Sequence, residues 1–382
     1  MSRSEPIYIA RTDDWPRLAR ELERADRMAI DLEFDRNRLR YGFQLCLMQI
    51  QVEDSTFLID PLGEDKIHEQ VFPFLEDPQK ETVVFSFSED QALLQYLGCK
   101  PRGLFDLGMA IRLLDHGQTS LASVLEGFLG VTISKESQKS DWFQRPLSDK
   151  QMNYAAQDVH HLFDLYDEVV SRAESRGVMN WIHEENRHLD ARIIPPDPED
   201  YYIRSKDRVG MDEVQWHIYK ALLGVREEWA RSKNRPGYRI TSYDAVKQQV
   251  TEGLPRQWQD WKIHPSFKNP QHFKRWKETF EKAKAEAEEL GLQKGRSARL
   301  TKLKPKGDPP KYNRFERDIL MKERIDPLRK VLKERYGDEV ATFLLSKRVA
   351  MDLLSGQAAD MPEYRLDLIR ETAKSLDIEL PF

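Results

Sequence analysis

The sequence predicts an α/β domain followed by a purely helical half. The apolar runs Met28–Ile30 and Thr82–Phe87 have the composition of buried strands, whereas Asp149–Val170 and Val214–Trp229 repeat apolar residues at the spacing of a helix. The proline-rich segment Pro195–Asp200 separates the two parts and is typical of a stiff linker, because proline cannot continue a helix or a strand. We therefore expect strands and helices to alternate before this linker and helices alone after it.

Two carboxylates follow the first apolar run. Asp31 and Glu33 are two residues apart, so alternation along a strand places both side chains on one face. Their charges would repel each other if left unpaired, and hard divalent cations bind such clustered carboxylate oxygens. The pair indicates a metal site if other residues supply further ligands, and otherwise only a strand end that reaches solvent.

Three more polar residues occupy positions that are typical of sites. Asp90 lies where the run Thr82–Phe87 gives way to a helix, and strand-to-helix junctions commonly hold ligands. Tyr154 and Asp158 stand one turn apart on one face of the helix predicted for Asp149–Val170. Taken singly, each is better explained by a structural role. Asp90 would be a helix N-cap, Asp158 part of a solvated face and Tyr154 a core aromatic.

In their order and spacing, these five residues resemble the exonuclease motifs of the DEDD superfamily, in the subgroup whose last motif is Tyr-x-x-x-Asp. The ribonuclease D family is the closest resemblance. Ile30–Asp35 and the following Gln44–Gln49 are similar to the first motif and its next strand, and Ser88–Asp90 to the second motif. The similarity covers roughly the first half of the chain. It continues towards the third motif at Leu104–Asp106, Ser120–Leu125, Leu129–Val131, Lys135, Asp141–Trp142 and Arg145–Leu147.

The resemblance implies a 3′-5′ exoribonuclease that uses two divalent ions, Mg²⁺ or Mn²⁺, in one site. Asp31 would bridge both ions, and Glu33 and Asp158 would complete the ion that activates the attacking water. Asp90 would help to hold the other ion, next to the leaving 3′ oxygen, largely through water. Tyr154 would orient the attacking water, since a phenol is an improbable bulk base at neutral pH. The substrates would be tRNA precursors and other small structured RNAs, and the products nucleoside 5′-monophosphates.

The resemblance also implies a ribonuclease H-like, three-layer exonuclease domain with a mixed sheet, followed by two small all-α HRDC-like domains. Leu222–Arg231 and the following Arg235–Pro236 resemble the first helix and turn of an HRDC domain, and Phe343–Leu354 resembles a helix of a second one. The expected boundaries are an exonuclease domain at 1–194, a linker at 195–209, an HRDC domain at 210–290, a basic linker at 291–313 and a second HRDC-like domain at 314–382.

The net charge of −5 conceals an uneven distribution. Residues 1–200 hold 22 Lys and Arg against 37 Asp and Glu, or −15, whereas residues 201–382 hold 38 against 28, or +10. An acidic catalytic half would repel RNA, so binding would need metal ions in the site and a basic surface elsewhere. The run Lys294–Lys311 is either a flexible basic linker that attracts phosphates or simply solvated. Upstream of this run, between residues 256 and 276, aromatic residues alternate with basic ones. Most of these rings are expected in a core, with one or two left to stack on bases: Trp258, Trp261, Phe267, Phe273 and Trp276.

Composition favours a cytoplasmic protein that does not contact membranes, while RNA as the partner is what the resemblance implies, and we expect a monomer. No apolar run approaches the length of a membrane span, and Met1–Pro6 lacks an apolar signal region. Cys46 and Cys99 are too few for a disulfide framework and are expected as buried small hydrophobes. His183 and His188 are five residues apart and diverge on a helix, which excludes a zinc-protease motif. The sequence also lacks a glycine-rich phosphate loop.

Two other functions stay open. Related domains digest the 3′ ends of DNA, and the motifs do not separate RNA from DNA; a contact to the sugar 2′-hydroxyl would. The chain would otherwise be an inactive nuclease fold that binds RNA. Phe85 supports this view, because many relatives carry a His five residues before the second-motif Asp and a phenyl ring cannot donate a hydrogen bond. All four acids and the tyrosine are retained, which favours an active enzyme.

Overall fold

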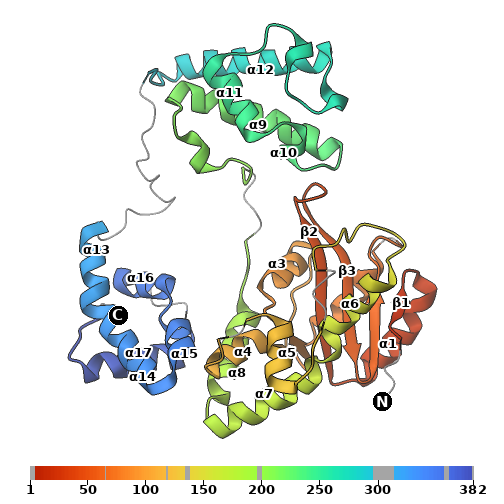
Figure 1. Ribbon diagram of the computed structural model, residues 1–382, viewed down its shortest axis with the longest axis vertical. Coiled ribbons are helices and arrows are strands. Elements are labelled where there is room, and N and C mark those ends of the chain that lie inside the picture. Colours follow the sequence, from red (N-terminus) through yellow and green to blue (C-terminus); the bar gives the residue numbers. More distant parts are fainter. Residues whose placement is uncertain are drawn as a thin grey trace. The chain divides into compact units, whose positions relative to one another are not determined.

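A computed structural model describes residues 5–64, 66–117, 119–133, 138–195, 200–295, 314–356 and 361–380. The chain divides into two compact units (Figure 1). The first unit comprises Met1–Phe34, Leu45–Ile194 and Pro310–Phe382, and the second comprises Asp35–Gln44 and Pro195–Pro309. Lys135 and residues 296–313, which include most of the predicted basic linker, lie outside the described residues. The predicted domain boundaries stay predictions.

The first unit contains a six-stranded sheet with the order β1-β4-β3-β2-β5-β6, and the sheet is mixed, as expected. β3 pairs antiparallel with β4, whereas the pairs β1 with β4, β2 with β5, and β5 with β6 are parallel. The strands are β1 (Ile7–Ile9), β2 (Arg27–Arg36), β3 (Phe43–Val52), β4 (Ser55–Ile59), β5 (Glu81–Val84) and β6 (Leu104–Asp106).

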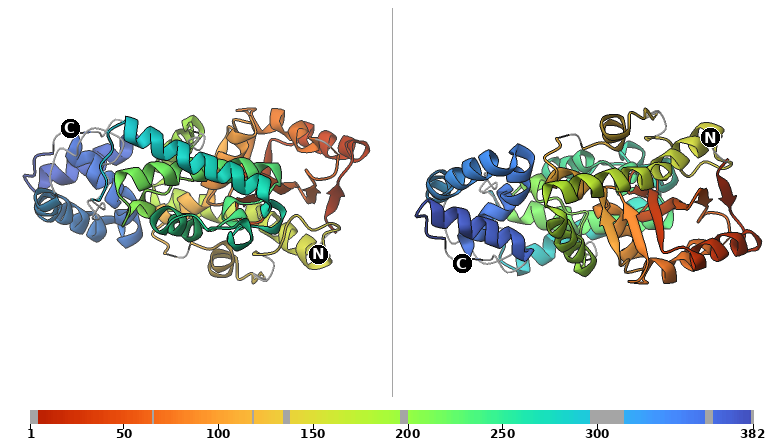
Figure 2. Two further views of the ribbon diagram at one scale, coloured as in Figure 1. Left: turned by 90° about the horizontal axis from the view of Figure 1, so that it is seen from above. Right: turned by 90° about the horizontal axis from the view of Figure 1, so that it is seen from below.

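Helices cover both faces of this sheet, which gives the three layers predicted for the domain (Figure 2). The central strand β3 is buried along nearly its whole length, as a strand between two helical layers must be. One interface brings Ala29, Val83 and Phe105 of the sheet against buried residues of the helices. The helices of this part are α1 (Trp15–Arg24), α2 (Phe72–Leu75), α3 (Ser88–Tyr96), α4 (Leu107–Leu113), α5 (Leu121–Leu129), α6 (Asp149–His160), α7 (Leu162–Arg176) and α8 (Met179–Ala191).

The single helix predicted for Asp149–Val170 is wrong in one respect. His161 has φ −102° and ψ 4°, outside the helical range, and divides the stretch into α6 and α7. Tyr154 and Asp158 both lie in α6, so their predicted one-turn separation is kept.

A second group of helices in the first unit has its own hydrophobic core. Its members are α13 (Arg314–Leu320), α14 (Asp326–Tyr336), α15 (Asp338–Leu344), α16 (Lys347–Ser355) and α17 (Glu363–Ser375). The helix predicted for Phe343–Leu354 is divided between α15 and α16. The hydroxyl of Ser346 accepts a hydrogen bond from Val349 N at 3.3 Å and begins α16, which explains the break.

A buried ion pair joins this helical group to the nuclease part of the same unit. Glu185 of α8 is 7% exposed and accepts hydrogen bonds from Arg365 Nε and from the Tyr364 hydroxyl, both at 2.5 Å. The ring of Trp181, also on α8, stacks on Tyr364 with 5.4 Å between centroids. The interface therefore combines a desolvated charge pair with aromatic packing.

The second unit is built around α9 (Glu213–Ser232), which packs against α10 (Gly237–Ile240), α11 (Tyr243–Glu252) and α12 (Pro270–Glu289). The helical face predicted for α9 is buried, and Trp261, Phe267 and Trp276 form the core with Trp229. The core assignment of these rings is confirmed, while Trp258 and Phe273 are only partly covered. Cys46 and Cys99 are buried free thiols, as expected. Within the described residues, no helix has the length and apolar character needed to cross a membrane.

Replacing Arg365 by Ala should lower the free energy of unfolding by about 3 kcal/mol or more, because Glu185 would stay buried without its cation. Urea unfolding followed by tryptophan fluorescence measures this. The matched control is Arg348→Ala. Arg348 is 90% exposed and lies 3.8 Å from Asp352, so its loss should cost below about 0.5 kcal/mol. Equal effects of the two variants would contradict a strong interaction at Glu185.

Candidate active site

Asp31 and Glu33 project from the middle of a strand. The apolar run was expected to end at these residues, but β2 continues through them to Arg36. Alternation along β2 places both carboxylates on one face, as predicted. A carboxylate oxygen from each of Asp31, Glu33 and Asp158 lies within 4.8 Å of the other two.

The third member of this group is held in place by the start of α6. The Ser148 hydroxyl accepts from Gln151 N at 3.3 Å, and the Gln151 side chain accepts from Ser148 N at 3.1 Å, which makes a capping box. Just before it, Arg145 donates to both oxygens of the buried Asp60, at 2.5 and 2.6 Å, and to the Cys46 carbonyl at 2.7 Å. These bonds tie the segment before α6 to the sheet that carries Asp31.

Asp90 lies in the first turn of α3, directly after β5, as the sequence predicts. The preceding turn is unusual, because Ser86 has φ 55°. The buried Asp106 carboxylate stabilises it by accepting from Ser86 N at 2.8 Å and Phe87 N at 3.1 Å. Asp90 is outside the group of three carboxylates defined above, but its charge raises the pKa of Glu33, and the charge of Asp31 raises the pKa of Asp90.

Burial raises the pKa of all four acids, and the charges of neighbouring acids raise it further in three of them. Burial and the charges of Asp31, Asp158 and Asp90 raise the pKa of Glu33 to about 10. Burial raises the pKa of Asp31, and burial together with the Asp31 charge raises the pKa values of Asp90 and Asp158. All three charges that act on Glu33 are negative. A bound cation would offset this repulsion and favour the ionised carboxylates.

Tyr154 is directly bonded to the acids. Its hydroxyl donates a hydrogen bond to Asp158, and burial together with the Asp158 charge raises the pKa of the phenol far above neutrality. The ring of Trp142 lies 6.0 Å from that of Tyr154, centroid to centroid, on the segment before α6. Tyr154 therefore stays protonated at neutral pH and serves as a fixed hydrogen-bond donor.

Divalent metal ions fit this donor set. The ligand atoms are carboxylate oxygens, which Mg²⁺ and Mn²⁺ prefer, and their shared charge is uncompensated by the groups around them. Asp31, Glu33 and Asp158 are placed to hold an ion, and Asp90 is close enough to contribute its charge.

The supporting roles of Asp106 and Arg145 were not predicted from the sequence. Both residues belong to segments that carry the family resemblance, yet neither is a candidate ligand. The position of Asp106 before a helix could have indicated an N-cap, and its carboxylate does accept from Met109 N at 3.2 Å and cap α4. No local pattern identifies Asp60 as the partner of Arg145. Phe85 packs against the core between the sheet and α4, so the ring that replaces the family's His has an apolar role here.

The comparisons with known proteins agree with this geometry. Residues 6–173 match a family model described as a 3′-5′ exonuclease. Ribonuclease D of Gluconacetobacter diazotrophicus is 30% identical over 245 residues, which cover 63% of this chain and 62% of that one. The RRP6-like 1 protein of Arabidopsis thaliana is 30% identical over 257 residues, which cover 66% of this chain and 36% of that one. The matches thus span only about six tenths of the length of the ribonuclease D relatives.

A solved structure supports the fold over nearly the full length. The crystal structure of Escherichia coli RNase D matches with a TM-score of 0.69 at 22% identity, covering 97% of this chain and 99% of that one. That protein is described as an exoribonuclease involved in structured RNA processing. The sequence match, the mixed sheet and the acidic cluster together identify residues 6–173 as a 3′-5′ exonuclease domain of the DEDD superfamily, in a chain related to ribonuclease D.

Proposed function

We propose that the protein is a metal-dependent 3′-5′ exoribonuclease that trims the 3′ ends of tRNA precursors and other small structured RNAs in the cytoplasm, as a monomer. The observation that carries this proposal is the convergence of Asp31, Glu33 and Asp158, with Asp90 nearby, in a domain of this family. Several relatives are ribonucleases D, which supports RNA as the substrate. The products would be nucleoside 5′-monophosphates.

We assign the site residues the roles that the family resemblance implies. Asp31 has the central position among the acids, since its charge acts on Glu33, Asp90 and Asp158, and it would be shared between two ions. Glu33 and Asp158 would hold the ion on the side of the attacking water, and Asp90 the other. Mg²⁺ or Mn²⁺ bound there would lower the pKa of the water and offset charge on the leaving 3′ oxygen.

The protein contributes position and a hydrogen bond. The Tyr154 hydroxyl donates to Asp158, so it would orient the attacking water by accepting a hydrogen bond from it. Its raised pKa excludes the free phenolate at neutral pH, so positioning is its main role. DNA end processing is the second candidate, because the carboxylates act on the phosphodiester and do not read the 2′-hydroxyl.

Asp31→Ala should abolish turnover while RNA binding persists. The test compares wild type and variant on matched 3′-tailed RNA and DNA hairpins, with Mg²⁺ or EDTA, at single-nucleotide resolution. We expect a metal-dependent ladder from the 3′ end of RNA that is weaker on DNA and absent in the variant. The control, Glu126→Ala, removes an exposed acid of α5 and should leave the ladder unchanged. A faster ladder on DNA would move the function to DNA, and no ladder on either polymer would mean an inactive binding module.

Tyr154→Phe should slow turnover by roughly 10²- to 10⁴-fold if the hydroxyl takes part in proton handling. Single-turnover rates at saturating enzyme separate this effect from binding. Tyr166→Phe is the matched control, because the Tyr166 hydroxyl donates instead to Glu81 at 3.1 Å. An unchanged rate for Tyr154→Phe would remove the hydroxyl from the mechanism.

The raised pKa values predict a link between pH, metal and stability. The unfolded carboxylates lose their protons near pH 4, whereas the folded ones hold them to higher pH, so the metal-free fold loses stability as the pH rises. Asp31→Asn removes one charge. In EDTA, its melting temperature should exceed that of wild type by about 4 °C or more at pH 8, and by less at pH 5.

Added Mg²⁺ should reduce or reverse this difference, since only the wild type keeps the full set of ligands. Glu126→Gln serves as the control and should follow the wild type at each pH. A difference between Asp31→Asn and wild type that is independent of pH and metal would show that the acids are not held together as described.

A further inference from the structure

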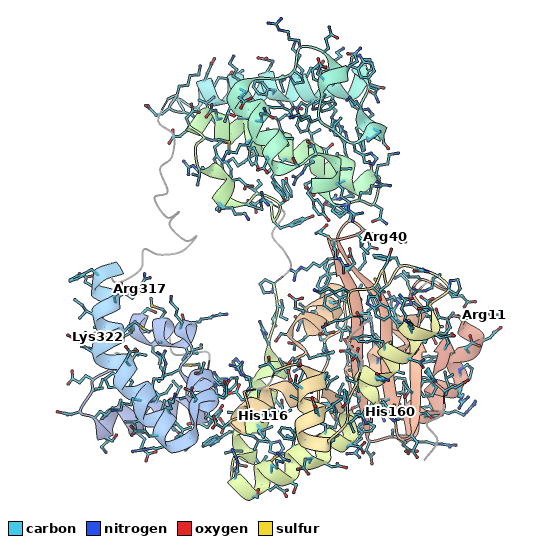
Figure 3. All side chains as sticks on the ribbon, viewed as in Figure 1. Arg11, Arg40, His116, His160, Arg317 and Lys322 are labelled. Atoms are coloured by element: carbon cyan, nitrogen blue, oxygen red, sulfur yellow. The ribbon has the colours of Figure 1, made fainter. Side chains whose placement is uncertain are left out.

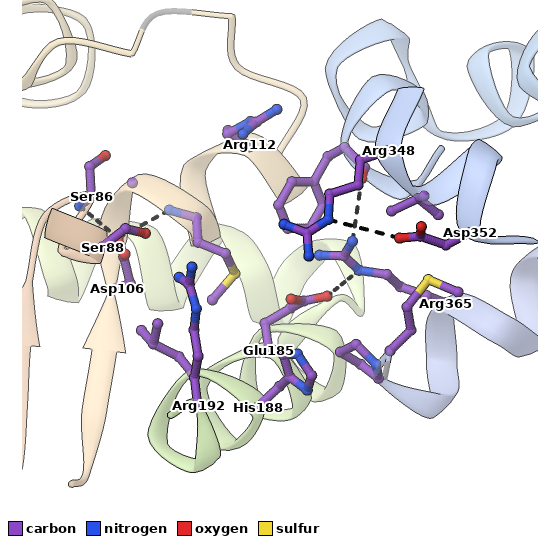
Figure 4. A pocket seen from close by; sticks show the side chains of 17 residues that line it. Ser86, Ser88, Asp106, Arg112, Glu185, His188, Arg192, Arg348, Asp352 and Arg365 are labelled. Atoms are coloured by element: carbon purple, nitrogen blue, oxygen red, sulfur yellow. Dashed lines mark hydrogen bonds and ion pairs between the residues drawn. The ribbon is translucent and has the colours of Figure 1, made fainter. Parts of the chain in front are cut away.

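A cavity of about 590 Å³ lies within the first unit, between α4 and α8 of the nuclease part and α15–α17 (Figure 4). Neither the acidic cluster nor the family match assigns it a role. Ser86 and Ser88 line one end of the cavity, and Ser88 is two residues from Asp90. Four arginines also line it: Arg112, Arg192, Arg348 and Arg365.

The carboxylates in this cavity already have partners. Glu185 is paired with Arg365 at 2.5 Å, and Asp352 lies 3.8 Å from Arg348. The Asp106 carboxylate accepts three backbone hydrogen bonds, from the amides of residues 86, 87 and 109. Glu185 and Asp352 are thus each paired with an arginine, and Asp106 is held by backbone amides.

Two guanidinium groups stay uncompensated. Within the described residues, Arg112 and Arg192 have no carboxylate partner, and Nε of Arg112 is buried without any hydrogen bond. Arg112 lies 5.0 Å from the centre of the Phe343 ring, and Arg365 lies 4.0 Å from the same ring. Figure 4 shows Arg192 extending from the end of α8 towards the turn that carries Ser86 and Ser88. The buried Nε of Arg112 is the group that lacks a partner here, and an anion bound beside the exposed Arg192 would supply one.

The turn before α3 lines the same end of the cavity. α3 begins at Ser88 without a side-chain cap, but its first turn carries Glu89 and Asp90, and the Asp90 carboxylate accepts from its own backbone amide. The side chains of Ser86 and Ser88 bring two hydroxyl groups to the cavity. The cavity thus combines guanidinium and hydroxyl donors, which bind phosphate oxygens.

We propose that this cavity is a phosphate-binding site for RNA, in which Arg112 and Arg192 bind a phosphodiester of the strand whose 3′ end is cleaved at Asp31. The inference rests on the proposed function and adds a second, electropositive binding point to an otherwise acidic nuclease part. The volume lies within the range of pockets that hold nucleotide-sized ligands. A phosphomonoester, such as the released nucleoside 5′-monophosphate, has the same chemistry and is the other source to be distinguished.

The test measures equilibrium binding by the full-length protein of a 5′-labelled RNA hairpin with a single-stranded 3′ tail, in Ca²⁺, with the RNA checked for integrity afterwards. Arg112→Ala/Arg192→Ala should weaken binding about tenfold and lower the slope of log K against log salt by about 0.7 for each phosphate that is no longer neutralised. Arg192→Ala alone, at an exposed position, should show part of the effect, and Arg192→Lys should restore most of the affinity. The matched control is Arg20→Ala/Arg24→Ala, two exposed arginines of α1 outside the cavity.

A parallel titration with AMP separates the two sources of phosphate. Loss of RNA affinity without AMP binding to the wild type supports the phosphodiester. AMP binding that disappears in the double variant, with RNA affinity unchanged, assigns the cavity to the product and overturns the proposal as stated. The proposal would also be overturned if the double variant, at wild-type melting temperature, had the same RNA affinity and salt slope as the α1 control. Failure of the proposed function would appear separately, as absent Mg²⁺-dependent turnover in the wild type.

Discussion

Repulsion among four carboxylates is the constraint on which the nuclease part depends. Asp31, Glu33, Asp90 and Asp158 come from a strand, a strand-to-helix junction and a helix, and the charge of Asp31 raises the pKa of the other three in their buried surroundings. Like charges do not approach by themselves, so the surrounding structure must hold these acids close together. Bound protons relieve the repulsion in the absence of metal, and bound divalent cations would relieve it in the proposed enzyme.

The supporting structure is therefore concentrated behind the acids. Asp106 fixes the left-handed turn at Ser86, which sets where α3 begins and where Asp90 points. Arg145 ties the approach to α6 to the sheet through Asp60, which sets the position of Asp158 and Tyr154 opposite β2. Both devices use buried charge-assisted hydrogen bonds, whose strength depends on exclusion of water. Arg145 thus has a structural role at the site, whereas Arg112 and Arg192 of the proposed phosphate cavity would bind the substrate.

Apolar runs and helical spacing predicted an α/β part followed by helices, because both are local signals. The mixed sheet and the set of acids came from the family resemblance, since each acid taken singly has a better structural explanation. Prediction misplaced the end of β2 and joined α6 to α7, because charged and polar residues inside a strand or at His161 do not indicate whether an element continues. The single helix that the resemblance implied at Phe343–Leu354 was also wrong, because the Ser346 cap begins a new helix there. Ion pairs between residues distant in sequence could not be predicted from local patterns. The pairs of Asp60 with Arg145 and of Glu185 with Arg365 form only when the fold brings the residues together.

The central claim is that the acids are assembled to hold metal ions, and crystals grown with Mn²⁺ test it most directly. Anomalous scattering should show manganese about 2.2 Å from carboxylate oxygens of Asp31, Glu33 and Asp158, the distance usual for oxygen ligands of such ions. A second peak between Asp31 and Asp90 would support the two-ion arrangement. Absence of any peak at these residues at saturating Mn²⁺, with the carboxyl groups bonded to one another through protons, would contradict the account.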